Sequence, residues 1–114
     1  MATVELPVRE QEKVCCTPQK LMRADRVEQL TDVLKALADP TRLQMVAILR
    51  EAKESVCICD LTATFDLSQP TISHHMARLR AAGLVESDRD GRWCYYRLRT
   101  DLAAPVKRLV EAVV

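Results

Sequence analysis

Apolar residues recur at helical spacing through most of this chain. Leu30, Leu34 and Leu37 repeat at intervals of four and three residues, which predicts a first amphipathic helix over about residues 19–37. A second helix follows, capped by Asp39 and carrying a proline at its first position. The first half of the chain is therefore expected to be helical.

Two shorter helices joined by a tight turn are predicted next. A very short strand is expected at residues 56–58, after which Asp60 is placed to cap a helix that runs to about Phe65. Ser68 is placed to cap the following helix, and Gly83 ends it. Two short helices in this arrangement are typical of a helix-turn-helix. The inner stripe of the second helix consists of Ile72, Met76 and Leu79.

The last third of the chain predicts a β-hairpin and a closing helix. Residues 84–87 and 93–98 are β-prone runs, and the charged segment 88–91, which ends in Asp-Gly, is a hairpin turn signal. Thr100 or Asp101 is placed to cap the last helix. Its apolar stripe is too extensive for a lone exposed helix, so a second copy is expected to cover it. The stripe consists of Leu102, Val106, Leu109, Val110 and Val113.

Length and composition bound the organisation. The 114 residues suffice for one mainly α domain with a small β-hairpin, of a size at which a homodimer is a common solution. Residues 1–18 show no periodicity and are expected to form a mobile N-terminal arm, and residues 19–114 form the winged helix-turn-helix domain. No run is long and apolar enough for a membrane span or a signal-peptide core, which favours a cytoplasmic protein without a membrane partner.

Charge is distributed unevenly along the chain. The net charge is only +1, yet residues 69–99 carry six Lys/Arg against three Asp/Glu, where a helix-turn-helix and wing would meet DNA. A merely solvated charged face is the alternative. Polar residues of the second short helix lie off its apolar stripe and are candidates for base edges or phosphates, and wing arginines are candidates for the backbone or minor groove. The candidate DNA-binding residues are Ser68, Gln69, Thr71, Ser73, His74, Arg78, Arg89 and Arg92.

The five cysteines supply the candidate chemistry. Cys15 and Cys16 lie in the arm, and Cys57 and Cys59 directly precede the helix-turn-helix. Thiols stay reduced in the cytoplasm, so an odd number of cysteines favours metal binding over structural disulfides. In an extended segment, residues two apart point the same way, so Cys57 and Cys59 form two arms of a chelate, and the arm supplies further sulfurs. Cys94 is expected to be a packing residue.

Three motifs together resemble the ArsR/SmtB family of metal-responsive repressors. They are Leu-Ala-Asp-Pro-Thr-Arg-Leu at 37–43, Cys-Ile-Cys-Asp-Leu at 57–61 and Leu-Ser-Gln-Pro-Thr-Ile-Ser-His-His at 67–75, and the resemblance spans about residues 20–113. It implies a winged-helix homodimer, built on its first and last helices, that represses a detoxification operon from a palindromic operator and leaves the DNA when metal binds. By similarity, the arm would reach the two core thiols of the partner subunit, although closure within one chain stays open.

Other metal sites are not favoured. His74 and His75 are helical neighbours that point about 100° apart and cannot easily share one ion. The last helix has Asp101 but no histidine, so it lacks the carboxylate and imidazole set of the family's zinc-sensing members.

The number and type of ligands that each ion prefers restrict the choice of inducing ion. Trivalent arsenic or antimony takes three sulfurs, whereas Cd(II) and Pb(II) accept three or four. The vicinal thiols and the Ser-Gln-Pro-Thr segment at 68–71 look more like the arsenic-responsive branch, so As(III) or Sb(III) is the favoured inducer and Cd(II) or Pb(II) the alternative. A thiol redox or persulfide sensor is a further alternative. No Cys-x-x-Cys pair or catalytic triad is evident, so neither an enzyme nor an organic cofactor is expected.

Overall fold

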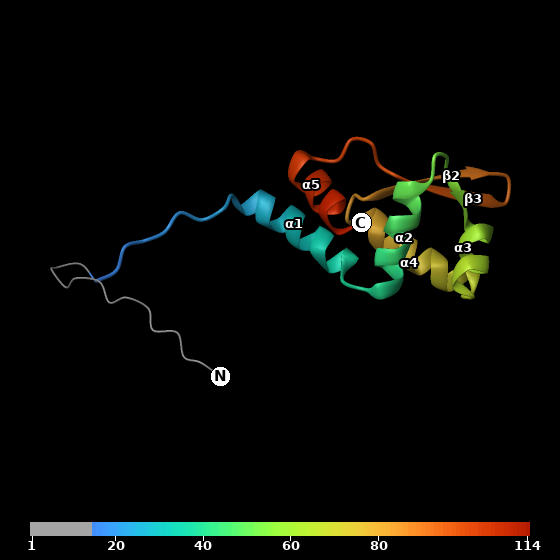
Figure 1. Cartoon of the computed structure of the whole chain (residues 1–114), viewed down its shortest axis with the longest axis horizontal. Helices are drawn as coiled ribbons and strands as arrows, with labels where there is room; N and C mark the ends of the chain where they lie inside the picture. Colours follow the sequence, from blue (N-terminus) through green and yellow to red (C-terminus); the bar gives the residue numbers. More distant parts are fainter. Residues whose placement is uncertain (1–14) are drawn as a thin grey trace.

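The computed structural model describes residues 15–114, so the first fourteen residues of the predicted arm lie outside the described part of the chain. Within residues 15–114, five helices and three strands form the folded body. Helices α1 and α5 lie side by side at the end where residues 15–23 enter, and α3 and the hairpin lie at the other end (Figure 1). The elements are α1 (Ala24–Leu37), α2 (Pro40–Glu51), β1 (Val56–Cys57), α3 (Ile58–Phe65), α4 (Gln69–Ala81), β2 (Val85–Asp90), β3 (Trp93–Leu98) and α5 (Ala104–Val113).

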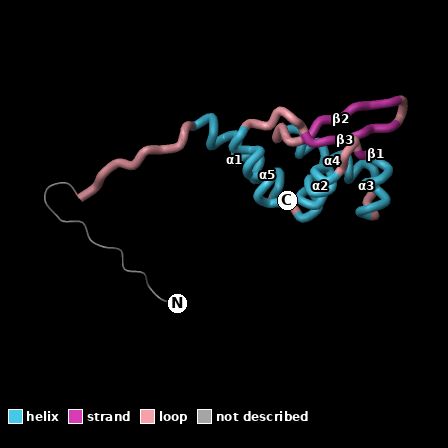
Figure 2. Tube along the Cα trace, turned by 45° about the horizontal axis from the view of Figure 1, so that its top comes forward, coloured by secondary structure: helices cyan, strands magenta, loops and turns pink. Residues whose placement is uncertain are grey.

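The sheet has the order β1-β3-β2 and is antiparallel throughout (Figure 2). The predicted hairpin is confirmed, but its turn is shorter than expected. Strand β2 continues through Asp90, which pairs with Trp93, so the loop is only Gly91 and Arg92. Gly91 has a φ of +63°, which glycine adopts without strain at the first position of a two-residue hairpin loop.

The core lies where α1, α2 and α4 pack against one another and against the sheet. The predicted inner stripe of α4 is confirmed, since Ile72, Met76 and Leu79 are all at most 1% exposed. Gly83 also has the expected role, because the chain leaves α4 through its positive φ of +79°. One face of α4 is therefore held in the core, and residues on its other faces are exposed.

Two predicted helix caps are confirmed. The side chain of Asp39 accepts a hydrogen bond from the Arg42 backbone N–H at 3.0 Å, and the Ser68 hydroxyl accepts one from the Thr71 backbone N–H at 3.4 Å. Each cap satisfies a backbone donor that the first turn of a helix leaves without a partner. These caps fix where the second helix and the fourth helix begin.

The predicted start of α1 was wrong. The helix begins at Ala24, five residues later than expected, and residues 15–23 contain no helix. Leu21 and Met22 are 87% and 53% exposed. Without a surface to pack against, a short stretch gains too little from helix formation to offset its cost in entropy.

Two predicted caps were also wrong. The helix α3 starts at Ile58, which leaves Asp60 inside the first turn, and Cys57 is the cap, its Sγ accepting from the Cys59 backbone N–H at 3.4 Å. Strand β1 accordingly ends at Cys57 and excludes Ile58. At the last helix the cap position is Ala103, without a side-chain cap; the carboxylate of Asp101 instead accepts hydrogen bonds from Arg99.

We predict that Asp39→Ala lowers the free energy of unfolding by about 1 kcal/mol, because it removes the α2 cap. The Arg42 backbone N–H holds the pKa of the Asp39 carboxyl below its ordinary value. The contribution of the charged form is therefore complete above the ordinary pKa and is lost as the pH falls through the lower folded pKa. Urea denaturation at neutral and acidic pH measures both effects. Asp39→Asn, which keeps an acceptor, should retain most of the stability at neutral pH; equal losses in both variants would contradict the capping role.

Candidate thiol site and DNA-binding face

Cys57 and Cys59, which we call the thiol pair, converge at the start of α3. Their Sγ atoms lie 2.8 Å apart, and Cys59 Sγ is 4.0 Å from Asp60 Oδ1. Cys57 is only 8% exposed, whereas Cys59 is exposed. The predicted convergence is present, but it does not arise from an extended segment, because Cys57 ends a strand and Cys59 lies in the first turn of a helix.

The short distance between the two thiols favours their protonated forms. The pKa of Cys59 is raised, first by its hydrogen bond with Cys57, then by desolvation and by the charges of Cys57 and Asp60. The negative charge of one thiolate disfavours ionisation of its neighbour. A thiophilic ion must therefore displace protons to bind here, so its apparent affinity rises with pH.

The other two predicted ligands form a second pair in the non-helical segment of residues 15–23, which includes the described end of the predicted arm. Cys15 Sγ and Cys16 Sγ lie 3.3 Å apart and both residues are exposed. In Figures 1 and 2 these residues lead away from α1, at the end of the molecule opposite to α3. The structure of one chain does not bring the four thiols together, and residues 15–114 contain no cluster of three or more potential metal ligands.

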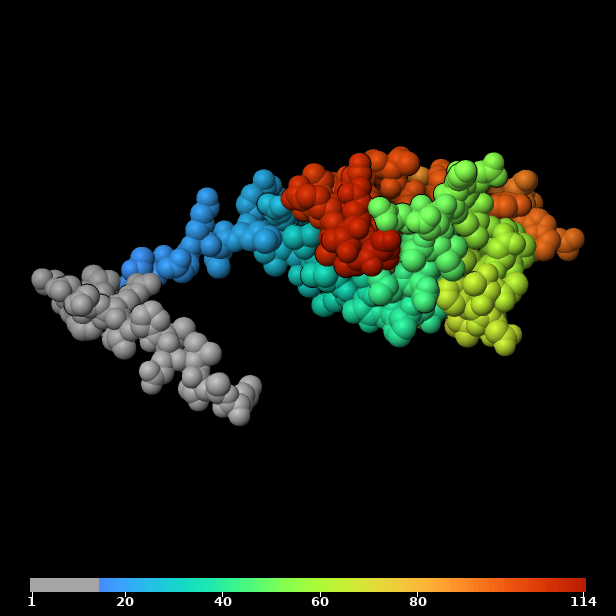
Figure 3. Space-filling model, in the orientation of Figure 1, coloured from blue at the N-terminus to red at the C-terminus, as the bar shows by residue number. Residues whose placement is uncertain are grey.

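Residues 15–23 project freely from the body, with no other element covering them in the view of Figure 3. Each pair alone offers two sulfurs, whereas As(III) takes three. A site with three sulfurs would therefore need at least one thiol from outside either pair, from the same chain or from another. The donor chemistry fits a soft ion because both pairs consist of thiols at short separation.

Most of the predicted DNA-binding residues of α4 and its cap face solvent. Gln69, Thr71, His74 and Arg78 are exposed. Ser68 is also exposed. Its hydroxyl caps α4 and lies 2.9 Å from the hydroxyl of Thr71. Ser73 is the exception, because it is half-buried.

Ser73 is half-buried and lies close enough to Tyr96 of β3 to lower the pKa of that side chain. The pKa of Tyr96 is raised, first by burial and then by its hydrogen bond with Cys94. Cys94 is half-buried too, in agreement with its expected packing role. These three side chains join β3 to α4.

The six arginines of residues 69–99 divide into two groups. Arg97 binds the carboxylates of Glu86 and Asp88, Arg99 binds Asp101, and Arg80 donates to the Ser87 hydroxyl at 3.0 Å. The remaining three have no acidic partner among residues 15–114. They are Arg78, Arg89 and Arg92, the three arginines predicted to bind DNA.

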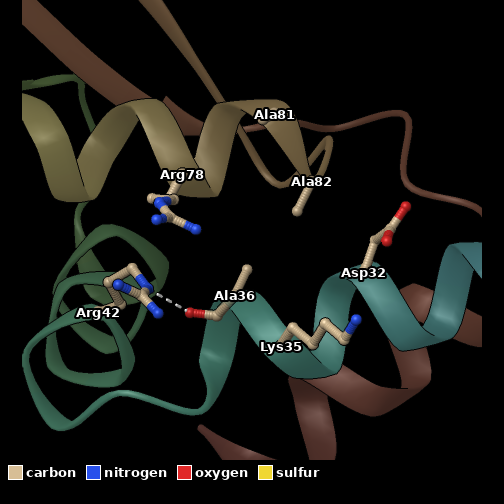
Figure 4. Close-up of a pocket in the computed structure, with 7 residues that line it drawn as sticks. All are labelled: Asp32, Lys35, Ala36, Arg42, Arg78, Ala81 and Ala82. Carbon is tan, nitrogen blue, oxygen red and sulfur yellow. Dashed lines mark hydrogen bonds between the residues drawn. The ribbon is translucent and has the colours of Figure 1, made fainter.

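Arg78 lines a cleft of about 320 Å³ between α1, α2 and α4. In Figure 4 its guanidinium points toward that of Arg42, with Lys35 and Asp32 along the opposite wall. Three cations against one carboxylate make the cleft electropositive. Sequence reasoning missed Lys35 and Arg42 because they come from different helices and share no motif that brings them together with Arg78.

Arg42 also fixes the position of α4. Its Nε donates to the Ala36 carbonyl at 2.6 Å, and its Nη1 lies 3.4 Å from His75 Nδ1. His75 Nδ1 is in turn 4.0 Å from Asp39 Oδ2. The end of α1, the cap of α2 and the middle of α4 therefore meet at one polar cluster, and His75 acts as a packing residue here.

The apolar stripe of α5 is divided between two roles. Val106 and Val110 are each 3% exposed and belong to the core of their own chain. Val113 remains 48% exposed, and on the neighbouring α1 Val27 and Leu34 are 44% and 52% exposed. An uncovered apolar surface therefore remains at the α1–α5 end.

Similarity to known proteins identifies the family of this chain. The model of the bacterial regulatory protein, arsR family, matches residues 39–87. The chain is 42% identical over 79 residues to the arsenical resistance operon repressor of Escherichia coli, covering 69% of this chain and 67% of that protein. The chain belongs to the ArsR family. It is also 43% identical over 82 residues to the arsenic resistance transcriptional regulator ArsR1 of Pseudomonas putida, covering 72% of this chain and 63% of that protein.

The fold agrees with membership of the ArsR family. The solution structure of the homodimeric winged helix-turn-helix DNA-binding domain Mb0332 from Mycobacterium bovis, described as a possible ArsR-family regulator, superposes with a TM-score of 0.65 at 30% identity, covering 86% of each chain. The predicted fold, mainly α with a winged helix-turn-helix, is confirmed. ArsR proteins are DNA-binding regulators and not enzymes. No helix within residues 15–114 is long and apolar enough to cross a membrane.

We predict that Arg92→Ala weakens DNA binding by a similar factor for all sequences and reduces the slope of log K against log salt by about 1, because one phosphate contact is lost. A salt titration of binding to duplex DNA measures both. Arg50→Ala is the matched control, since Arg50 lies beside α5 and the segment after β3, outside α4 and the hairpin. Equal effects of the two substitutions would exclude a wing contact.

Proposed function

We propose that this ArsR-family protein is a repressor that binds a palindromic operator as a homodimer and is released when As(III) or Sb(III) binds cysteine thiolates. The supporting observation is the thiol pair at the start of α3, with its Sγ atoms 2.8 Å apart. This helix is the first of the helix-turn-helix, so a ligand on these sulfurs acts directly on the DNA-binding unit. The homologous arsenical resistance repressor of E. coli supports the choice of ligand.

The proposed ligands are Cys15, Cys16, Cys57 and Cys59. Three of them suffice for the pyramidal coordination of As(III), and four suit Cd(II) or Pb(II), the alternative inducers. In one chain the arm leaves the body at the end opposite to the thiol pair (Figure 1). A second chain packed against α1 and α5 offers the arm a different thiol pair, so we place the completed site between subunits.

The exposed apolar surface at the α1–α5 end supports the homodimer. Val27, Leu34 and Val113 would be covered there, and burial of apolar area is the main driving force of such association. Each subunit then presents one α4, and the two helices must lie about one DNA turn, or ~34 Å, apart. A small displacement of each α3–α4 unit breaks that register.

Release requires only a difference in affinity. The ion must bind the DNA-incompetent arrangement more tightly, by about 1 to 3 kcal/mol for ordinary coupling between sites. Ligation changes the separation of the two Sγ atoms and requires loss of the hydrogen bond that raises the pKa of Cys59. Since Cys57 is also the helix cap, the start of α3 must adjust.

A redox sensor is the second candidate, because the same thiol separation of 2.8 Å suits cross-linking. Mass spectrometry separates the two functions. Arsenite adds one arsenic atom with loss of the thiol protons, whereas an oxidant removes two hydrogen atoms and forms a disulfide.

We predict that replacing both members of the thiol pair with serine leaves operator affinity within about threefold and abolishes release by arsenite, since the sulfurs serve the inducer and not the DNA. Replacing Cys15 and Cys16 with serine should have the same effect. Mobility-shift titrations with and without arsenite give the measurement, and Cys94→Ser is the matched control that should still release. Retention of full arsenite response in either double variant would contradict the proposed ligand set.

We also predict that Leu34→Glu shifts the protein toward monomer and lowers operator affinity at least tenfold, because a charge would replace an apolar contact at the α1–α5 surface. Sedimentation or light scattering gives the mass. Leu43→Glu, at an exposed leucine of α2 outside that surface, is the control and should stay dimeric. A monomeric wild-type chain would refute the homodimer.

A further inference from the structure

Tyr95 of β3 lies directly beside the thiol pair. It is the partner of Cys57 in the β1–β3 ladder, and directly opposed residues project from the same face with Cβ atoms about 5 Å apart. Cys57 is buried and accepts a hydrogen bond from the Cys59 thiol, so the half-buried Tyr95 side chain lies on the strand next to this thiol pair. Burial raises the pKa of Tyr95, and the charges of Cys57, Asp90, Cys59 and Asp60 raise it further, in agreement with this placement.

The same face of β3 continues to the tip of the wing. Trp93 is two residues before Tyr95, about 7 Å along the strand and on the same face. Trp93 is 46% exposed, and the guanidinium carbon of Arg92 lies 5.7 Å from its ring centroid. Arg92, which has no acidic partner among the described residues, therefore packs on the row of side chains that begins at the thiol pair.

The opposite face of β3 contacts α4. Tyr96 is 6% exposed, and its hydroxyl group is close enough to Ser73 of α4 for that side chain to lower the Tyr96 pKa. Neighbouring residues of a strand project to opposite faces, so a shift of the backbone at Tyr95 also displaces Tyr96. One strand thus touches the thiol pair on one side and α4 on the other.

We propose that Tyr95 is a positioning residue that transmits ligand binding at Cys57 and Cys59 to β3, so that the wing and α4 are displaced together. This inference rests on the proposed function and adds a second output to it, since the thiol pair also begins α3. We assign this role to the ring, because the Tyr95 hydroxyl group makes no hydrogen bond to the thiol pair. Tyr95→Phe therefore preserves transmission, whereas Tyr95→Ala removes it.

The test uses the full-length protein with arsenite as the probe. In Tyr95→Ala the ratio of operator dissociation constants with and without arsenite should fall at least tenfold, while the arsenite affinity of the DNA-free protein changes less than threefold. In Tyr95→Phe both quantities should match the wild type. Tyr95→Leu, which keeps an apolar side chain, replaces the alanine variant if circular dichroism shows that the latter is unfolded. An unchanged ratio in the folded alanine or leucine variant overturns the proposal.

Trp93 is the only tryptophan and supplies an independent reading of the wing. Arsenite should change its emission in the wild type and in Tyr95→Phe, but much less in Tyr95→Ala. Direct quenching by arsenic would act equally in both variants. Equal emission changes in the two variants, or no change in the wild type despite bound arsenite, also overturn the proposal.

A failure of the proposed function is recognised separately, because the wild type would then not bind arsenite or not release DNA. In that case, transmission from the thiol pair to the wing is tested with diamide, in a variant in which Cys15 and Cys16 are replaced by serine. Diamide takes up both thiol hydrogens of Cys57 and Cys59, becomes a hydrazine and leaves a disulfide between them. A shift in Trp93 emission that is retained in Tyr95→Phe and lost in Tyr95→Ala supports transmission, and its absence from the Tyr95→Phe protein overturns it.

Discussion

Cys57 takes part in three structures at once, and the candidate mechanism depends on this. Its backbone pairs with Tyr95 in the sheet, its side chain caps α3, and its Sγ lies 2.8 Å from that of Cys59. Protein interiors are close-packed, so a buried side chain cannot move without adjustment by its neighbours. A change in the bonding of this sulfur therefore reaches both the first helix of the helix-turn-helix and the central strand of the sheet.

Periodicity and cap chemistry predicted most of the fold. The stripe formed by Ile72, Met76 and Leu79, and the caps at Asp39 and Ser68, are where the sequence placed them. The failures have local physical reasons. Asp60 has a side chain suited to a helix cap. However, Cys57 is the last residue paired with β3 and itself caps α3, so the helix begins three residues earlier than expected. Asp101 does not cap the last helix, because its carboxylate forms an ion pair with Arg99. Rules for helix caps do not take such competing partners into account.

The candidate sites could be predicted only as far as local spacing determines them. Convergence within each cysteine pair follows from short separation in the chain. The distance between the pairs does not, because it depends on the path of the chain between residues 16 and 57. Likewise, counting charges could not separate Arg97, whose charge is compensated by Glu86 and Asp88, from Arg89 and Arg92, which have no acidic partner within residues 15–114. The electropositive cleft of Figure 4 required the packing of three helices and had no signature in the sequence.

The two cysteine pairs lie at opposite ends of one chain (Figure 1), which restricts how an ion could regulate the protein. If one ion needs sulfurs from both pairs, a site completed across a dimer forms only when the α1–α5 surfaces are already associated. Ligation then stabilises the dimer by mass action instead of dissociating it, since the ion binds only the assembled form. DNA release must therefore come from a change of geometry within the dimer. The strand that carries Tyr95 and Tyr96 is suited to this, because it contacts the thiol pair and α4 without taking part in the α1–α5 surface.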